Sequence, residues 1–129
     1  MAKVAFLGLG VMGYPMAGHL KTKGGHEVTV YNRTGAKAAK WVAEFGGNSA
    51  PTPKQAAEGQ DFVMCCVGND DDLRQVTLGP DGAFAAMKKG SVFVDHTTAS
   101  AEIARELYQA GKERGFEVSD APVSGGIAA

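Results

Sequence analysis

The sequence predicts an open, doubly wound α/β domain with a mostly parallel sheet. Short apolar runs alternate along the chain with amphipathic helical patterns, and many of the glycines stand at the ends of these segments. A glycine-rich turn joins the first apolar run to the first helical pattern. Strands that alternate with helices are connected by right-handed crossovers, which make the strands parallel and cover both faces of the sheet.

The predicted strands are short apolar segments between turn signals. Phe62–Val67 is apolar throughout, which is typical of a central strand that helices cover on both faces. The two cysteines, Cys65 and Cys66, fall within this strand, and we expect small buried side chains rather than a disulfide or a metal pair. In chain order, the predicted strands cover residues 4–7, 28–31, 48–50, 62–67, 92–94 and 116–118.

The predicted helices between these strands have start and stop signals of their own. Thr52-Pro53-Lys54-Gln55 has the form of a capping box with proline at the first helical position, and Ser100 caps the last helix. The acidic run Asp70–Asp72 caps N–H groups and complements the dipole of the next helix, so we assign it no metal. In chain order, the helical patterns cover residues 12–23, 38–45, 53–59, 70–79 and 100–110.

Length and composition fit one ordinary globular domain. The chain has 129 residues, of which 44% are hydrophobic and 21% are charged, and its net charge is −1. This balance gives no electrostatic case for binding nucleic acid or an anionic membrane. No apolar run approaches the ~18 residues of a membrane-spanning helix, and Met1-Ala2-Lys3 leads straight into the first strand, so no signal peptide is expected. We therefore expect a cytoplasmic protein.

The glycine-rich turn, Gly8-Leu9-Gly10-Val11-Met12-Gly13, has the spacing of a dinucleotide-binding turn between a strand and a helix. The first glycine permits the tight turn, the second lets the backbone approach a pyrophosphate, and the third lets the helix pack closely on the strand. The helix N-terminus supplies N–H groups and a positive dipole end to the phosphates. The motif predicts a cofactor site in a domain of the Rossmann type.

The end of the second predicted strand indicates which dinucleotide is bound. NAD-binding domains usually carry Asp or Glu there, about twenty residues past the glycines, where the carboxylate binds the ribose hydroxyls. This chain has Asn32-Arg33-Thr34 instead. The Arg33 guanidinium can pair with a 2′-phosphate, Thr34 can add a hydroxyl and Lys37 a further charge. The predicted cofactor is therefore NADP rather than NAD.

Four segments, in the right order and covering the chain from end to end, resemble a single family. They are Phe6–Ala17, Tyr31–Thr34, Asp95–Thr98 and Asp120–Gly126. They resemble the glycine turn, the NADP-type second-strand end, the D-x-[ST]-T segment and the substrate loop of the β-hydroxyacid dehydrogenases. That family includes 3-hydroxyisobutyrate dehydrogenase, tartronate semialdehyde reductase and the glyoxylate/succinic semialdehyde reductases. The resemblance implies an NADP-dependent interconversion of a β-hydroxy acid and its semialdehyde.

The resemblance also implies a role for each matching residue. The glycine turn matches the pyrophosphate site, and Asn32, Arg33 and Thr34 match the adenosine ribose and 2′-phosphate site. Val67 and Gly68 match the dipeptide that packs near the nicotinamide half. The remaining matches are Thr98, near the nicotinamide ribose, and Ser124, Gly125 and Gly126, which hold the substrate carboxylate.

The family's general acid/base is a lysine on a helix of a second, helical domain, beyond the last matching segment. The 129 residues end at Ala129, before that helix, so residues 1–129 are predicted to be the nucleotide-binding domain, with no catalytic residue in this chain. We expect the chain by itself to be inactive. In the full-length protein the resemblance implies a small hydroxy acid or aldehyde substrate, and homo-oligomers that form through the helical domain.

Two further hypotheses stay open at this point. A related reductase, such as an imine reductase or a 6-phosphogluconate-type dehydrogenase, fits the same nucleotide-binding motifs. A non-catalytic dinucleotide-binding interaction module would keep the fold without the chemistry. Presence of the catalytic lysine in the full-length protein distinguishes an enzyme from such a module. His96 follows a strand end in the predicted ligand crevice, but no Ser or Cys arrangement accompanies it and we assign it no catalytic role.

Overall fold

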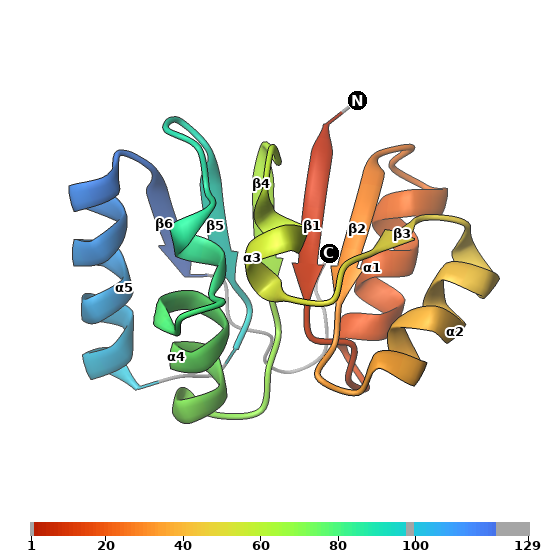
Figure 1. Ribbon diagram of the computed structural model, residues 1–129, viewed down its shortest axis with the longest axis horizontal. Helices are drawn as coiled ribbons and strands as arrows, with labels where there is room; N and C mark the ends of the chain where they lie inside the picture. Colours follow the sequence, from red (N-terminus) through yellow and green to blue (C-terminus); the bar gives the residue numbers. More distant parts are fainter. Residues whose placement is uncertain (1, 98–99, 121–129) are drawn as a thin grey trace.

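The computed structural model describes residues 2–97 and 100–120, which form one parallel sheet with helices on both faces (Figure 1). The sheet has six strands in the order β3-β2-β1-β4-β5-β6, and every neighbouring pair is parallel. This confirms the predicted doubly wound Rossmann-type fold. The strands are β1 (Lys3–Leu7), β2 (Glu27–Tyr31), β3 (Asn48–Ser49), β4 (Phe62–Cys65), β5 (Val92–Asp95) and β6 (Glu117–Asp120).

The helices divide between the two faces of the sheet. One hydrophobic core joins the sheet to α1 and α2, with Phe6 and Trp41 fully buried in it. The other core lies under α3, α4 and α5 and contains Leu7, Leu73 and Leu107. Phe6 and Leu7 point to opposite cores because successive side chains of a strand alternate between faces. The helices are α1 (Gly13–Thr22), α2 (Gly35–Phe45), α3 (Pro53–Ala57), α4 (Asp70–Leu78) and α5 (Ala101–Arg114), with a 3₁₀ turn η1 at Ala83–Ala85.

The register brings the carboxyl ends of the central strands to one level. Leu7 at the end of β1 is paired with Tyr31 of β2 on one side and with Cys65 of β4 on the other. Cys65 is in turn level with Asp95 of β5. The loops after these strands therefore meet at one edge of the sheet, the lower edge in Figure 1. The strand order reverses between β1 and β4, and such a switch point is where sheets of this class bind their ligands.

Two of the predicted helix caps are confirmed, and a third is corrected. The Thr52 hydroxyl accepts the Gln55 N–H at 3.1 Å, and the Ser100 hydroxyl accepts the Ile103 N–H at 3.3 Å. The residue that caps α4 is Asn69, whose side-chain oxygen accepts the Asp72 N–H at 2.8 Å. The acids Asp70–Asp72 occupy the first turn of α4 rather than its cap position, where they still complement the helix dipole.

The prediction that β4 extends to Val67 is wrong by two residues. The ladder ends at Cys65, and the Cys66 N–H makes a last bond to the Leu7 carbonyl at 2.9 Å. The next amide, that of Val67, donates to the Thr97 hydroxyl rather than to a strand. Cys65 is buried as expected, whereas Cys66 is only half-buried. The sequence analysis did not predict η1. It placed the end of the last helix at residue 110, but α5 continues to Arg114, and Gly115 ends the helix with a φ of 89°.

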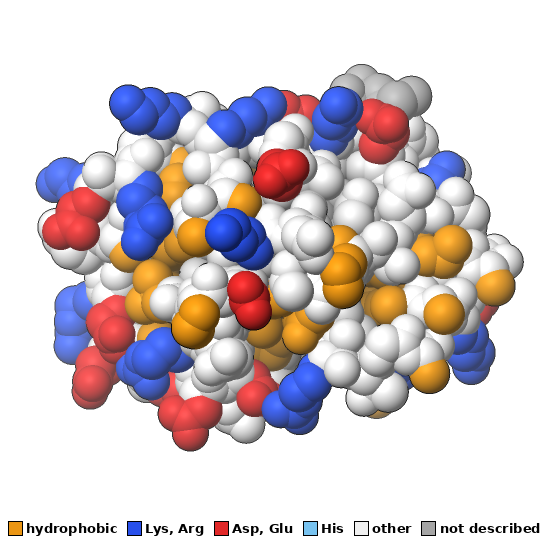
Figure 2. Space-filling model, in the orientation of Figure 1, with side chains coloured by type: hydrophobic (Ala, Val, Ile, Leu, Met, Phe, Trp, Pro, Cys, Tyr) orange, Lys and Arg blue, Asp and Glu red, His pale blue; other side chains and the backbone are white. Residues whose placement is uncertain are grey.

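The molecular surface agrees with the near-neutral charge of the chain. On the face seen in Figure 2, basic and acidic side chains are interspersed. Within the described residues, no helix is long and apolar enough to cross a membrane. The same part of the chain contains no group of three or more His, Cys, Asp or Glu placed to hold a metal ion.

We predict that Asn69→Ala lowers the free energy of unfolding by about 0.5–2 kcal/mol, because α4 loses the side-chain acceptor at its N-cap. Asn69→Ser keeps an acceptor and is expected to stay close to the wild type. Urea denaturation followed by circular dichroism measures both variants. An alanine variant as stable as the serine variant would show that the hydrogen bond to the Asp72 N–H contributes nothing.

Candidate functional site

A cavity of about 450 Å³ lies at the carboxyl ends of β1, β2 and β4. The glycine turn forms one wall, the end of β2 a second, and the β4–α4 loop with the first turns of α4 a third. Most residues predicted to bind cofactor therefore surround one space. The lining residues are Gly8, Leu9, Gly10, Val11, Met12, Gly13, Tyr31, Asn32, Arg33, Cys66, Val67, Gly68, Asp72, Gln75 and Val76.

The three motif glycines are required for different physical reasons. Gly8 has a φ of 98°, and a Cβ there would collide with the Cys66 carbonyl oxygen. A Cβ on Gly13 would collide with the Gly8 carbonyl oxygen and approach the Phe6 ring. A Cβ on Gly10 would meet nothing within 4 Å. Gly8 and Gly13 are thus needed for the fold of the turn, whereas Gly10 keeps open space in the wall of the cavity.

The N-terminus of α1 has the features of an anion-binding site. No side chain caps this helix at Met12, and its first turn contains no acidic residue. The amide groups and the positive end of the helix dipole thus face the cavity with no carboxylate on α1 to neutralise them. Together with the open space beside Gly10, this is what a pyrophosphate requires, so the chain's own residues fit a dinucleotide.

The Asn32 side chain fixes the glycine turn to the end of β2. Its oxygen accepts the Leu9 N–H at 2.9 Å, and its amide group donates to the Thr34 carbonyl at 3.1 Å. The Gly8 N–H donates to the Tyr31 carbonyl at 2.8 Å alongside. Asn32 therefore shapes the cavity by binding backbone, which the sequence analysis did not predict.

Arg33 and Thr34 occupy different positions beside the cavity. Arg33 lines it with an 83% exposed side chain, and its guanidinium forms an ion pair with Asp72 at 3.2 Å. Thr34 follows at the N-cap of α2, outside the lining residues, and its hydroxyl makes no capping hydrogen bond with that helix. Arg33 is thus the cation of the β2 end that reaches the cavity.

Thr97 holds the Val67–Gly68 segment, and the sequence analysis missed it. Thr97 is 3% exposed. Its hydroxyl accepts the Val67 N–H at 3.0 Å, and its own N–H donates to the Asp95 carboxylate at 2.8 Å.

The Cys65 thiol lies next to this chain of polar contacts. Burial, reinforced by the nearby Asp95 carboxylate, raises the pKa of the Cys65 thiol well above its usual value. Cys65 is therefore a protonated packing residue, and the polar chain from Asp95 to Val67 fixes the loop. The D-x-[ST]-T pattern of Asp95–Thr98 is a sequence signal that could have pointed to this arrangement, although only Thr98 was given a role from it.

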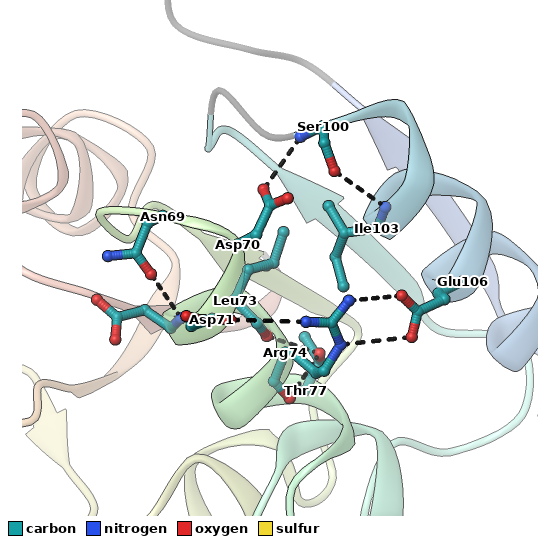
Figure 3. A network of polar contacts seen from close by, with 10 residues as sticks. Asn69, Asp70, Asp71, Leu73, Arg74, Thr77, Ser100, Ile103 and Glu106 are labelled. Carbon is teal, nitrogen blue, oxygen red and sulfur yellow. Dashed lines mark hydrogen bonds and ion pairs between the residues drawn. The ribbon is translucent and has the colours of Figure 1, made fainter.

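The α4 wall of the cavity is fastened to α5 by a network of polar contacts (Figure 3). Arg74 binds Glu106 through two hydrogen bonds, at 2.6 and 3.4 Å. The Asp70 carboxylate accepts the Ser100 N–H at 3.0 Å, which joins the starts of the two helices. Hydrogen bonding from Arg74 lowers the pKa of Glu106, and hydrogen bonding from Ser100 lowers the pKa of Asp70. The lowered pKa values favour the ionised carboxylates that accept these hydrogen bonds between α4 and α5.

Four predicted site residues lie outside the described residues: Thr98, Ser124, Gly125 and Gly126. His96 follows β5, and its N–H donates to the Cys65 carbonyl at 2.8 Å. It is not among the residues lining the cavity.

The fold and the cavity define a dinucleotide-binding domain of the Rossmann type. Residues 3–129 match the family described as the NAD binding domain of 6-phosphogluconate dehydrogenase, and the chain belongs to this family. An uncharacterised oxidoreductase of Shewanella frigidimarina is 63% identical over 128 residues, which are 99% of this chain and 44% of that protein.

Solved structures agree with this assignment. The 3-hydroxyisobutyrate dehydrogenase of Mycobacterium tuberculosis, in a structure with L-serine, superposes with a TM-score of 0.86 at 32% identity, covering 98% of this chain and 42% of that one. Psf3 in complex with NADP⁺ and 2-OPP gives a TM-score of 0.86 at 29% identity, covering 95% and 43%. The resemblance to 3-hydroxyisobutyrate dehydrogenase-like proteins is thus confirmed. The chain spans less than half the length of these relatives.

We predict that Gly10→Val abolishes dinucleotide binding while the domain keeps its fold, because the side chain fills open space that a pyrophosphate needs. Calorimetric titration with NADPH, together with thermal unfolding, tests this. Gly13→Ala is the comparison, since its Cβ collides with backbone and we expect a clear loss of stability. Unchanged NADPH affinity in Gly10→Val would mean that the glycine turn does not contact the cofactor.

Proposed function

We propose that this chain binds NADP in preference to NAD, as the nucleotide-binding domain of an oxidoreductase that interconverts a β-hydroxy acid and its semialdehyde. The observation that carries the cofactor preference is Arg33, an exposed guanidinium at the β2 end of the cavity, where NAD-binding domains place a carboxylate. A guanidinium binds a phosphate through a planar fork, whereas a carboxylate at the same strand end would repel it. The NADP⁺ complex of the similar Psf3 structure supports this choice.

Different residues of the chain bind different parts of the cofactor in this proposal. The glycine turn and the α1 N-terminus hold the pyrophosphate, Arg33 holds the 2′-phosphate, and Val67–Gly68 pack near the nicotinamide half. Bound NADP supplies the hydride chemistry, and the protein orients it against substrate. Thr98 near the nicotinamide ribose, and Ser124, Gly125 and Gly126 at the substrate carboxylate, remain part of this proposal on the strength of the sequence resemblance.

The oxidoreductase class comes from the relatives, and the substrate class is the finer part of the proposal. The similar M. tuberculosis enzyme is a 3-hydroxyisobutyrate dehydrogenase, which supports a small β-hydroxy acid. In the full-length protein we place proton transfer on the lysine of the helical domain, and homo-oligomer contacts on the same domain. A cytoplasmic location remains a prediction from the sequence.

We predict that Arg33→Ala weakens NADPH binding by about ten- to a hundred-fold, because a hydrogen bond to a charged group is worth ~1.5–3 kcal/mol. NADH, which lacks the 2′-phosphate, should bind nearly unchanged. Calorimetric titration with the two cofactors separates these effects. Arg105→Ala removes the same charge from the exposed face of α5 and should alter neither affinity. Equal losses for NADPH and NADH in Arg33→Ala would contradict the assignment.

We predict that the 129-residue chain binds NADPH yet shows no turnover of 3-hydroxyisobutyrate, glyoxylate or succinic semialdehyde. A positioned acid/base contributes ~10²–10⁴-fold, and the proposal places that group outside these residues. NADPH oxidation at high protein concentration measures the aldehyde reactions, and NADP⁺ reduction measures the alcohol. Turnover at rates typical of enzymes would show that a residue of this chain supplies the proton, and His96 would be the first to replace.

A further inference from the structure

The Arg33–Asp72 ion pair connects two walls of the cavity. Arg33 extends from the end of β2, and Asp72 from the first turn of α4, 39 residues further along the chain. Both residues line the cavity, and the side-chain atoms that pair lie 3.2 Å apart. The cation proposed to bind a 2′-phosphate is therefore already held by a carboxylate of the same chain.

The carboxylate of Asp72 is held close to the cavity wall. The Asp72 N–H is bound by the Asn69 side chain at 2.8 Å, which fixes the backbone at this point of α4. The second carboxylate oxygen of Asp72 lies beside Gly68. A Cβ built on that glycine would be 3.6 Å from this oxygen. Arg33 is the more accessible partner, because its side chain is 83% exposed and that of Asp72 only 31% exposed. A phosphate that enters the cavity can thus reach the Arg33 guanidinium without displacing Asp72 from its own position.

A 2′-phosphate and Asp72 would bind the same guanidinium. An exposed ion pair of this kind is weak, so a phosphate can displace it, but displacement still costs the energy of the pair. A nucleotide without the 2′-phosphate can bind while the Arg33–Asp72 ion pair stays intact. The ion pair therefore lowers affinity for NADP selectively and leaves NAD unaffected.

We propose that Asp72 is a specificity-determining residue, which competes with the 2′-phosphate for Arg33 and so limits the preference of the site for NADP over NAD. This inference rests on the proposed function and deepens it, because it names a second residue that sets cofactor choice. Asp72 acts through Arg33 and takes no part in the chemistry.

The test compares Asp72→Asn with the wild type by calorimetric titration. We expect NADPH to bind about three- to five-fold more tightly to the variant, and NADH to change by less than about two-fold. Adenosine 2′,5′-bisphosphate and AMP form a second pair of probes that differ only in the 2′-phosphate, and they should show the same contrast. Asp71→Asn is the matched control, since it removes an equal charge from the same helix turn at a side chain that is 98% exposed. It should leave all four affinities unchanged.

A double variant, Arg33→Ala with Asp72→Asn, tests competition directly. Without Arg33 there is no guanidinium for the Asp72 substitution to free. We therefore expect Asp72→Asn to change NADPH affinity by less than about two-fold in this background. A full gain that persists there would overturn the proposal, because Asp72 would then act by repelling phosphate rather than by holding Arg33. An equal gain for NADPH and NADH, or no gain, would overturn it as well.

The outcome for Arg33→Ala alone separates this inference from the proposed function. If that variant loses NADPH selectively and Asp72→Asn gains nothing, the role of Asp72 is wrong and the NADP preference stands. If Arg33→Ala loses nothing, the NADP assignment and the role of Asp72 fail together.

Discussion

The cavity depends on the close approach between the glycine turn and the end of β4. At Gly8 the backbone passes so near the Cys66 carbonyl that no side chain fits between them. The left-handed conformation of Gly8 then turns the chain toward α1, and the contact between Gly8 and Gly13 brings the helix close to the strand. Because these approaches are fixed by backbone atoms, the position of the α1 N-terminus relative to β4 does not depend on flexible side chains.

Polar side chains hold the other walls against this backbone frame. Asn32 joins the end of β2 to the glycine turn, and Thr97 joins the loop after β5 to the loop after β4. The contacts of Asp70 with Ser100 and of Arg74 with Glu106 fasten α4 to α5. Each wall thus has a hydrogen bond to a neighbouring loop or helix, and the shape of the cavity is set by contacts within the chain. Contacts of this kind reduce the entropic cost of ordering loops when a ligand binds.

The sequence predicted those parts of the structure that short-range signals determine. Alternating apolar and helical patterns predicted the succession of strands and helices along the chain and the parallel sheet. The Thr52 and Ser100 caps were found because a cap and its partner are three residues apart. The end of β4 was missed because apolar character continues to Val67, while the change of hydrogen-bond partner depends on Thr97, thirty residues further on. The acidic run after Asn69 likewise hid the true cap of α4.

In the site, too, short-range signals could be predicted from the sequence and contacts between distant segments could not. The positions of the glycine turn and Arg33 beside the cavity could be predicted, because each follows the first strand at a characteristic spacing. The backbone-binding role of Asn32, the anchoring by Thr97 and the contact of Arg33 with Asp72 could not, since each joins segments that only the folded sheet brings together.

The open space beside Gly10 has a consequence for how such domains diverge. Gly8 and Gly13 are fixed by collisions within the turn and Gly10 is not, so under the proposed function one base change at the Gly10 codon would separate ligand binding from folding. If the proposed site is correct, a gene duplicate with a larger residue there would keep the fold and lose the cofactor. The residue at this one position would then separate copies that bind a nucleotide from copies that keep only the scaffold.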